Sequence, residues 1–583
     1  MKRAASILLV LCLLTSLLTT ACAEAAHSFA SQEYTFYVVD EDPEFMPPTM
    51  LFFFDDVYDL PWLDVEELAD LLVDLQHRVF EEADYGLTFS AEGETVTLTR
   101  ENGYSMKLDC DADTITFDDY NGFLKDPSDS ALLDQLPTFT GYNESGEPEL
   151  FQRDALASFD RYGDVVELNL ADYNIELIHE GERYYIPLQT ANDFLFAPMF
   201  RRYILFNGEA MFLVNDNDLV DYSAMEFKPL GELYYGAEPT RRSEALAAFG
   251  YNELSLMLDS LYGLKEQHNI EYFGRMFWQV GFDDALDSVD PMDADTALKN
   301  FIDYYLDDLH SGFALTSWMT GYDFIESEAG PSSRLDNAQS QKYAKLRAAG
   351  MGEDWQGYQE VGNTAYITFD TFESVSGEDY YGIAAGSGPS AQGEPIQNTA
   401  GLIVYAHQQI YREGSPIENV VIDLSNNYGG SVDAALFLMS WIIGEAEISI
   451  EDTFTGAQST LVYRADVSLD RKFDESDTLH DKHVYCLVSP VSFSCGNLVP
   501  AACKYHQAVT LIGRTTGGGA CEVQPMSTAW GSMFQMSGAR RLSFRKNGSL
   551  YDIDEGVDPD IYIDHLELLY DREALTEFIN GLS

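Results

Sequence analysis

The sequence is poor in basic residues, and this shortage excludes two large classes of partner. Lysine and arginine together number 33 against 98 aspartates and glutamates, which gives a formal net charge of −65 at pH 7. A chain this acidic repels the phosphates of nucleic acids and of anionic lipid headgroups. We therefore expect no nucleic-acid binding, and the acidity is typical of solubility in a salty extracellular medium.

Cysteine is also scarce, and its spacing argues against a metal site. Seven cysteines occur, none of them in a C-x-x-C pair, so a structural zinc site is not expected. Cys503 and His506 stand at i and i+3 on a predicted helix. A buried thiol explains this cysteine more simply than a metal ligand does. No metal and no organic cofactor is predicted.

No long apolar run follows the N-terminus, so no membrane-spanning segment is predicted after it. The N-terminus itself has Lys2 and Arg3 before the apolar run ILLVLCLLTSLL, followed by the small residues of TTACAEAA. This order is typical of a signal peptide, which we predict over residues 1–25. Cys22 is an alternative lipid-anchor site and would be the one link to a membrane. The chain is therefore expected to be extracellular or attached to the cell surface.

The length predicts several domains. At 583 residues, with 46% hydrophobic residues, the chain is too long for one core and too apolar to be disordered. Residues 26–235 alternate short β-rich runs with turns, and hairpins are predicted in TVTLTRENGYSMKLDC and YNIELIHEGERYYIPL. This region is predicted to be an N-terminal α+β accessory domain that selects or gates substrates.

Residues 236–330 show helical periodicity and contain one noteworthy histidine. Apolar residues of the first predicted helix recur at i, i+3, i+4, i+7 and i+8: Leu254, Met257, Leu258, Leu261 and Tyr262. A second predicted helix ends at His310, beside Asp307 and Asp308, with Gly312 as its left-handed stop. This placement should favour the protonated imidazole. The span 313–360 is polar and is predicted to be irregular.

Residues 331–583 are predicted to form an α/β core. The β-rich runs TAYITF, NVVIDLS, HVYCLVS and VTLIG alternate with predicted helices. Two of these strands run into turns that open helices, in IDLSNNYGGSVDAAL and VYCLVSPVSFSCGNL. N–H groups at a helix start point outward and favour negative charge. Two such turns meeting at one point would therefore form a hole for an oxyanion.

Ser494, in the second of these turns, has two interpretations. It is either a nucleophile held between strand and helix or an N-cap serine, and Ser492 is the nearest rival nucleophile. A serine nucleophile needs a base within reach. The following loop, GRTTGGGA, contains no lysine or histidine.

Five short motifs occur in the order LDDLHSG, IDLSNNYGG, SCGN, IGRTTGG and GVDPD. Together they resemble, in the same order, the motifs of the tail-specific or C-terminal processing serine peptidases, the clan that includes the tricorn core. LDDLHSG resembles L-x-D-x-H-T/S, and IDLSNNYGG resembles D-L-R-x-N-x-G-G. SCGN matches the nucleophile motif with Ser494 as its serine, IGRTTGG resembles G-E-x-T-x-G, and GVDPD is the closing motif. The resemblance implies a crotonase/Clp-protease-like α/β core, with a helical subdomain that carries the base.

Departures from the family pattern indicate one branch of it. The processing branch uses a Ser–Lys dyad, but counting 25 residues from Ser494 arrives at Gly519. There is also no room before the α/β core for the PDZ domain of that branch. Both departures indicate the tricorn-like branch, in which a histidine from the helical region is the base. In that branch a serine precedes the histidine, whereas here Leu309 precedes His310 and Ser311 follows it.

The resemblance implies acyl-enzyme cleavage of peptide bonds in a peptide or protein substrate. Ser494 is the implied nucleophile and His310 the implied general base. The backbone N–H groups of Gly429, Gly430 and Cys495 are the implied donors to the oxyanion.

The motifs leave several candidates for the acidic residue that would orient the base. Glu555 is the first choice, with Asp554 and Asp552 as alternatives and Ser311 as a further candidate orienter. Because these neighbours of the histidine differ from the family pattern, a catalytically impaired pseudoenzyme that binds peptides is an alternative function. An envelope scaffold, in which the N-terminal domain carries the function, is another.

Cys495 and Cys521 are expected to lie close together. Cys495 follows the implied nucleophile, and Cys521 comes two residues after Gly519, the position where relatives place a lysine against their serine. The pair is either a disulfide, which exported proteins can keep, or two buried free thiols.

Overall fold

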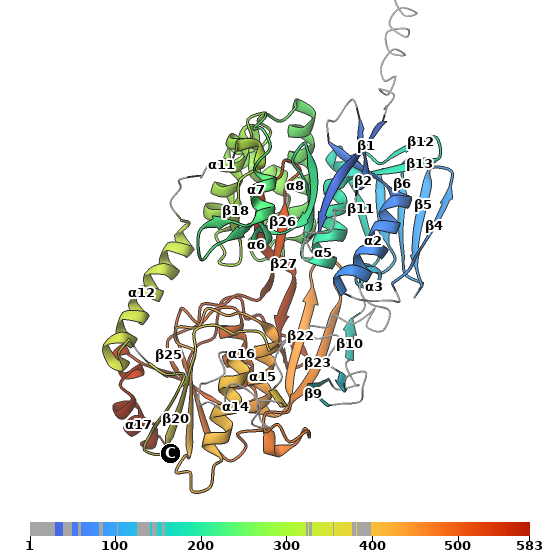
Figure 1. Ribbon diagram of the computed structural model, residues 1–583. Coiled ribbons are helices and arrows are strands. Elements are labelled where there is room, and N and C mark those ends of the chain that lie inside the picture. Colours follow the sequence, from blue (N-terminus) through green and yellow to red (C-terminus); the bar gives the residue numbers. More distant parts are fainter. Residues whose placement is uncertain are drawn as a thin grey trace, which may run out of the picture.

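Two lobes, joined by strands and by one long helix, make up the computed structural model (Figure 1). The N-terminal lobe holds most residues up to 321, and the C-terminal lobe holds most residues after 355. The predicted signal peptide and Cys22 lie outside the described residues. The structure describes residues 29–38, 49–55, 60–80, 85–101, 103–124, 140–142, 148–153, 158–161, 163–321, 325, 329–353, 355–375, 380–381 and 398–582.

A six-stranded sheet forms the centre of the C-terminal lobe. Its order is β19 (Tyr358–Val361), β20 (Thr364–Thr368), β21 (Asn419–Asp423), β24 (His483–Val488), β25 (Thr510–Gly513) and β30 (Ile561–Tyr562). β19 is antiparallel to β20, and all other neighbours are parallel. The predicted α/β core is confirmed.

Helices cover both faces of this sheet, as a buried parallel sheet requires. Successive residues of β21 alternate between two hydrophobic clusters: Val420 and Ile422 pack with α14 (Thr399–Ile410), α15 (Val432–Ile443) and α16 (Cys495–Tyr505). Val421 packs in the other cluster with α12 (Pro331–Met351) and α17 (Arg572–Asn580). The period of two along a strand produces this division.

An eight-stranded sheet connects the lobes. Its path is β18 (Gly312–Leu315), β27 (Met533–Ser543), β22 (Ala446–Asp452), β23 (Gln458–Ala465), β9 (Pro148–Arg153) and β8 (Thr140–Tyr142). β10 (Ser158–Arg161) pairs with β23, and β26 (Cys521–Ser527) pairs with β27. In Figure 1, β26 and β27 rise from the C-terminal lobe into the N-terminal lobe, so the chain after Ser494 crosses between the lobes.

Two larger sheets in the described part of the N-terminal lobe confirm both predicted hairpins. The seven-stranded sheet has the order β12 (Ile178–Glu180), β13 (Arg183–Pro187), β3 (Pro61–Asp64), β2 (Thr49–Asp55), β1 (Phe29–Val38), β15 (Ala210–Val214) and β14 (Tyr203–Phe206). The five-stranded sheet has the order β11 (Val166–Asn169), β7 (Thr114–Phe117), β6 (Ser105–Asp109), β5 (Thr95–Arg100) and β4 (Leu87–Glu92). β5–β6 and β12–β13 are the hairpins.

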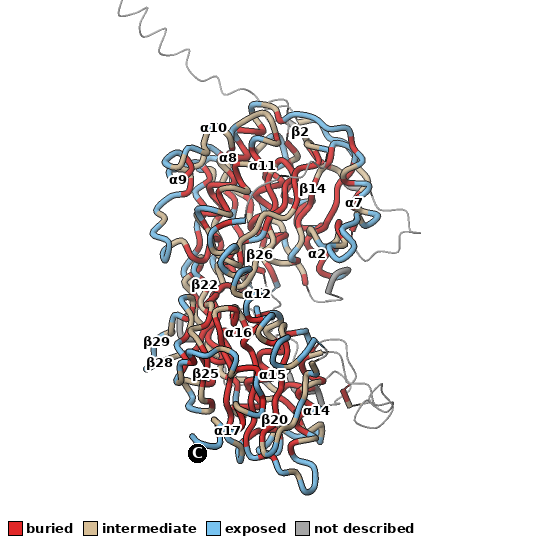
Figure 2. Tube along the Cα trace, turned by 90° about the vertical axis from the view of Figure 1, so that its left-hand side faces the viewer, coloured by how far each residue is buried: buried red, intermediate tan, exposed pale blue. Residues whose placement is uncertain are grey.

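One hydrophobic cluster spans the N-terminal sheets and the helices that follow them. It includes residues of α2 (Val65–Phe80), α8 (Glu244–Leu261) and α11 (Pro291–Phe301), together with residues of β26 and β27. Figure 2 shows buried residues filling the interior of both lobes. α5 (Ala197–Phe200) contacts β26 and lies next to the cavity described below.

The span predicted to be irregular, 313–360, contains the 21-residue helix α12. Only Tyr343 and Arg347 of this helix are buried. Because so few of its residues face a core, the sequence carries no apolar stripe from which the helix could be predicted.

The carboxyl groups of Asp193 and Glu253 are buried together in the N-terminal lobe, where the π-helical turn Asn192–Phe196 meets α8. Asp193 accepts a hydrogen bond from Gln189 (2.9 Å), and Glu253 accepts one from Thr190 (2.8 Å). Burial raises the pKa of Glu253 to about 7, and burial together with the charge of Glu253 raises the pKa of Asp193. The pair therefore retains a proton that the separate groups would have lost.

This pair is expected to make the protein less stable as the pH rises. The folded-state pKa of Glu253 exceeds the ordinary value of 4.5, so stability falls as the pH rises from about 4.5 to about 7 and then levels off. Glu253→Gln should remove on the order of 3 kcal/mol of this dependence. Melting temperatures at pH 5 and pH 8 measure it, with exposed Glu244→Gln on the same helix as the control. A wild-type melting temperature that is higher at pH 8 than at pH 5, and unaffected by Glu253→Gln, would contradict the expectation.

Candidate active site

Ser494 lies in a strained turn between β24 and α16 rather than acting as a helix cap. Its backbone has φ 56° and ψ −123°, and its side chain makes no capping hydrogen bond. Its N–H donates to the carbonyl of Gly518 (2.8 Å). A non-glycine residue at positive φ costs roughly 1–3 kcal/mol, and such strain concentrates at functional sites. The structure therefore argues against the interpretation of Ser494 as an N-cap serine.

The asparagine-glycine-glycine turn after β21 lies directly against this serine. Asn427 fixes the turn, because its Nδ2 donates to Phe369 O (3.2 Å) and its Oδ1 accepts from Gly429 N (2.9 Å). Gly429 has φ 104°, and a Cβ there would lie 2.7 Å from the Cβ of Ser494. Only glycine therefore allows this close approach.

Two of the three implied oxyanion donors have free N–H groups. The N–H of Gly429 is occupied by Asn427, as described above. Gly430 and Phe372 form a parallel β-bridge, in which the backbone of Phe372 bonds to Gly429 O and Ser431 N on either side of Gly430. The N–H of Gly430 itself therefore faces away from Phe372. Within the described residues, neither this N–H nor that of Cys495, the first residue of α16, has an acceptor. Gly430 and Cys495 are therefore the better candidates.

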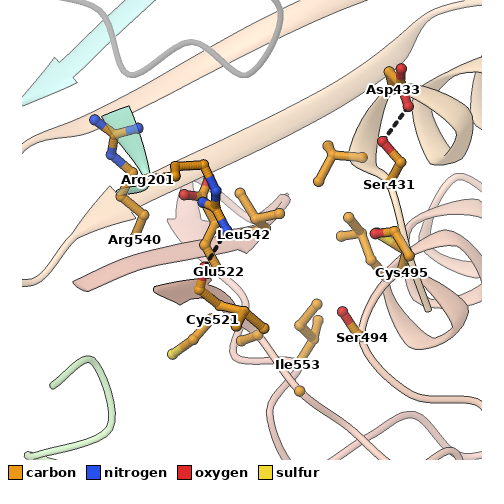
Figure 3. Close-up of a pocket in the computed structure, with 16 residues that line it drawn as sticks. Arg201, Ser431, Asp433, Ser494, Cys495, Cys521, Glu522, Arg540, Leu542 and Ile553 are labelled. Carbon is orange, nitrogen blue, oxygen red and sulfur yellow. Dashed lines mark hydrogen bonds between the residues drawn. The ribbon is translucent and has the colours of Figure 1, made fainter. Parts of the chain in front are cut away.

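A cavity of about 530 Å³ opens beside Ser494 (Figure 3). The turns at Gly430 and Cys495 form one side of it. Cys521 and its neighbours in β26 and β27 form another, and Arg201 reaches it from the N-terminal lobe. The cavity therefore lies where the two lobes meet, next to the candidate nucleophile.

Cys495 and Cys521 line this same cavity as free thiols. The disulfide alternative is wrong, and the alternative of two buried thiols is confirmed. Burial raises the pKa of Cys495 to about 12 and that of Cys521 well above its ordinary value. Neither is therefore a reactive thiolate near neutral pH.

His310 lies in a turn after the helix, not at the helix end as predicted. α11 continues into a π-helical turn (Ile302–Leu306), and Asp307, with φ 46°, takes the left-handed position expected for Gly312. Gly312 instead begins β18. The Asp307 carboxylate accepts the N–H of Ser332 at the start of α12 (2.9 Å), which holds the chain in this conformation.

Asp308 anchors the turn that carries His310. Its carboxylate accepts hydrogen bonds from the backbone N–H groups of His310 and Ser311 and from the hydroxyl groups of Tyr262, Ser311 and Ser537. Ser311 therefore contacts Asp308, not the imidazole. Sequence reasoning placed Asp308 near His310 but did not assign it this positioning role.

The rings of His310 and Phe493 lie side by side, with centroids 4.7 Å apart. His310 lines a second cavity of about 430 Å³, which also includes Gly519. Gly519 lines both cavities, and the Phe493 ring lies so close to it that a Cβ there would be 2.6 Å from the ring. His310 and Ser494 thus line different cavities that share Gly519, and no hydrogen bond joins the two side chains.

Burial lowers the pKa of His310, and the carboxylates of Asp308 and Asp554 only partly offset this effect. The expectation that the helix end would favour the protonated imidazole is therefore wrong. A neutral imidazole near pH 7 suits a general base, because the group can accept a proton. His268, which the sequence reasoning missed, lines the same cavity but is exposed and lies 3.3 Å from the hydroxyl of Tyr262.

Among the candidate acids, Asp554 lies nearest the histidine's cavity. It is part of the lining, whereas Glu555 is exposed and is not. Asp554 Oδ1 accepts the N–H of Ala520 (2.9 Å), and Oδ2 accepts no hydrogen bond within the described residues. Asp552 forms an ion pair with Arg541 (2.9 Å). The geometry favours Asp554 over Glu555 as the orienting acid.

Ser492, the rival nucleophile, is fully buried. Its hydroxyl donates to the carbonyl of Leu424 (2.7 Å) and accepts the N–H of Ser489 (3.0 Å). It lines neither of the two cavities. Ser492 therefore has a structural part in the turn.

Neither a metal site nor a membrane span is found in the described part of the chain. No group of three or more His, Cys, Asp or Glu side chains could hold a metal ion there. No helix in those residues is both long and apolar enough to cross a bilayer.

Comparison with known proteins gives one family match. Residues 363–563 match the family model of Peptidase family S41, a range that includes Ser494 but not His310. No curated protein matches the chain.

Solved structures show only distant similarity. The photosystem II D1 C-terminal processing protease is 19% identical, with 34% of this chain and 42% of that chain covered and a TM-score of 0.24. Mature CPAF with lactacystin is 12% identical (58% and 98% covered, TM-score 0.37). A lipoprotein from Streptococcus agalactiae is 13% identical (58% and 96%, 0.34). The chain thus spans less than half of the first of these proteins, and the family rests on the sequence match.

Proposed function

We propose that the chain is a serine-type peptidase of family S41, whose model residues 363–563 match, and that Ser494 and His310 carry its chemistry. The observation that carries the proposal is the strained backbone of Ser494, whose unpartnered hydroxyl faces a cavity beside two free N–H groups. The family predicted from the five motifs is confirmed by the match. The assignment of individual residues is our proposal.

The proposed reaction follows the acyl-enzyme route. Ser494 Oγ attacks the carbonyl carbon of the scissile peptide bond while His310 takes the hydroxyl proton. The N–H groups of Gly430 and Cys495 stabilise the oxyanion, and His310 returns the proton to the leaving amine. Water, activated by the same imidazole, then releases the acyl group. His310 and Ser494 share no hydrogen bond in the structure, so the two side chains must approach each other when the substrate binds, as catalytic hydrogen bonds often tighten only in the substrate complex.

Covalent labelling tests this function. We expect a fluorophosphonate to react with the folded full-length chain, and mass spectrometry of the digested adduct to place the label on Ser494. Incubation with casein-like substrates should release peptides. A label on another serine would reject Ser494. Peptide binding without labelling or cleavage would favour the pseudoenzyme alternative.

The orienting acid can be identified from the pH dependence of kcat/KM. The Asp554 charge raises the pKa of His310, so Asp554→Asn should move the acidic limb of the profile to lower pH and reduce kcat roughly 10-fold or more. Glu555→Gln, one residue away and exposed, is the matched control and should change neither. The opposite pattern would return the role to Glu555.

We also propose that the peptidase acts outside the cell or at the cell surface. The basic, apolar and small-residue order of the first 25 residues supports export, and the net charge of −65 supports solubility there. Sequencing the N-terminus of protein recovered from the medium or cell surface tests this. A mature chain that begins at a lipid-modified Cys22 would support the anchored form.

A further inference from the structure

The helix α12 runs from the N-terminal lobe to the C-terminal lobe and buries very little of its surface (Figure 1). Of its 21 residues, only Tyr343 and Arg347 are buried. Most of the stability of a helix in a protein comes from tertiary packing. The position of α12 therefore depends on a small number of contacts, and each of these contacts lies next to a part of the proposed active site.

The first turn of α12 is fixed to the segment that carries His310. The Asp307 carboxylate accepts the N–H of Ser332 (2.9 Å). Gly330, which precedes the helix, packs so closely against the π-helical turn before Asp307 that a Cβ would overlap the carbonyl oxygen of Asp303. The start of the helix and the turn of the proposed base therefore move together.

Tyr343 connects the middle of α12 to the turn that carries the nucleophile, Ser489–Ser494. Its ring belongs to the same hydrophobic cluster as Val491 of that turn. Its hydroxyl interacts with the side chain of Ser489, the first residue of the turn. One of the two buried side chains of the helix is thus used to contact the nucleophile turn.

Arg347, the other buried side chain, forms a bidentate ion pair with Asp370. Nη1 donates to Oδ1 (2.5 Å) and Nη2 to Oδ2 (2.6 Å). The guanidinium also lies over the ring of Trp355, 4.3 Å from its centroid. Two parallel hydrogen bonds fix the angle between the two groups as well as their distance.

Asp370 belongs to the segment that shapes the oxyanion turn. Its carbonyl accepts the N–H of Tyr428 (3.2 Å), and Phe372 bonds to both neighbours of Gly430. These bonds leave the N–H of Gly430 free on the side away from Phe372. The orientation of this proposed oxyanion donor therefore depends on a segment that Arg347 holds in place.

We propose that α12 positions the base, the nucleophile and the oxyanion turn relative to one another, and that Arg347 is the positioning residue for the oxyanion turn. The inference rests on the proposed peptidase function. Arg347 contacts none of the reacting groups and acts through Asp370. Oxyanion donors and bases are effective only when they are held accurately, so displacement of the helix should slow the chemical step.

Kinetics of Arg347→Gln test the positioning role at a temperature where melting curves show the variant to be folded. We expect kcat and the rate of fluorophosphonate labelling to fall about 10- to 100-fold, with KM little changed. Arg347→Lys keeps the charge but not the fork, so it should restore only part of the rate. Asp370→Asn, which weakens the same pair from its more exposed side, should reproduce the loss.

Arg412→Gln is the matched control, because Arg412 forms an equally bidentate pair with Glu360 in the same lobe, away from the two cavities (2.5 and 2.8 Å). It should change neither kcat nor labelling. A purely structural Arg347 would lower the melting temperature and leave kcat of the folded enzyme unchanged. That result would overturn the proposal.

Asp307→Gly tests the other end of the helix, since glycine keeps the left-handed backbone and removes the carboxylate that holds Ser332. We expect kcat to fall about 10-fold. Combined with Arg347→Gln, the loss should be smaller than the product of the two single losses, because either change already releases the helix. Fully multiplicative losses would show two independent contacts and overturn the shared role of α12.

Hydrogen exchange separates this inference from the proposed function, because it needs no activity. In Arg347→Gln, the amides of residues 424–431 should exchange faster than in wild type, whereas in Arg412→Gln they should not. Unchanged exchange in Arg347→Gln would overturn the link to the oxyanion turn. Wild type that is neither labelled nor active would overturn the peptidase assignment of Ser494, and faster exchange in Arg347→Gln would still support the link.

Discussion

Replacing Ser494 with alanine is expected to lower kcat/KM for peptide hydrolysis by about 10⁴-fold or more and to abolish fluorophosphonate labelling. The hydroxyl is the only group proposed to form the covalent bond, so nothing else can take over its step. The fold should persist, because the Ser494 side chain makes no hydrogen bond within the described residues. Steady-state hydrolysis, together with melting temperatures, measures both parts of the expectation.

Ser492→Ala is the informative control, since that residue lies two positions away. It should lower the melting temperature, because the carbonyl of Leu424 and the N–H of Ser489 lose a buried partner, at about 1–3 kcal/mol each. Labelling of the folded fraction should continue. If Ser492→Ala abolished labelling while Ser494→Ala did not, the nucleophile would be Ser492.

The motifs in the sequence were sufficient to predict the immediate surroundings of the nucleophile. Two other motifs meet the nucleophile motif at Ser494: Gly429 of IDLSNNYGG packs against its Cβ, and Gly518 of IGRTTGG accepts its N–H. Thr516, in the same motif as Gly518, fastens the following loop. Thr516 Oγ1 donates to Oδ1 of Asn497 (2.7 Å) and accepts the N–H of Val557 (2.6 Å). These residues are tied to backbone geometry, and such requirements appear directly as fixed residue types in a sequence.

The position of the histidine's turn could not be predicted in the same way. Glycine is the usual left-handed residue at a helix end, so Gly312 was the natural choice. The tertiary contact between Asp307 and the start of α12 places the left-handed residue five positions earlier. α12 itself has only two buried residues and leaves no periodic signal. A contact between two segments that are each weakly patterned is invisible to local rules.

Strand pairing and burial account for the other differences. β8, β9 and β10 come from the predicted accessory domain, yet β9 and β10 pair with β23, about 300 residues away. No local signal specifies such a partner. Likewise, the acidic neighbours of His310 are visible in the sequence, but the burial that outweighs them is not. The direction of a pKa shift needs the desolvation of the group as well as its charges.

Replacing His310 with alanine is expected to reduce kcat by about 10²- to 10⁴-fold, the range typical for loss of a general base. The turn should stay folded, because Asp308 holds its backbone and the imidazole has no hydrogen-bond partner in the described residues. His268→Ala is the matched control, since that ring lines the same cavity but is exposed and adjoins Tyr262. It should leave kcat unchanged.

The pH dependence and chemical rescue decide whether His310 acts as the base or only supports Phe493. Burial lowers its pKa below the ordinary 6.5, so wild-type kcat/KM should rise through one ionisation below that value and be level at neutral pH. Because the ring borders a cavity of about 430 Å³, added imidazole can enter the space left in His310→Ala and restore part of the activity. A support role predicts rescue by His310→Phe, which fills the space beside Phe493 without accepting a proton. Activity in His310→Phe without imidazole would therefore reject the Ser494–His310 mechanism, whereas rescue by imidazole alone assigns the proton transfer to His310.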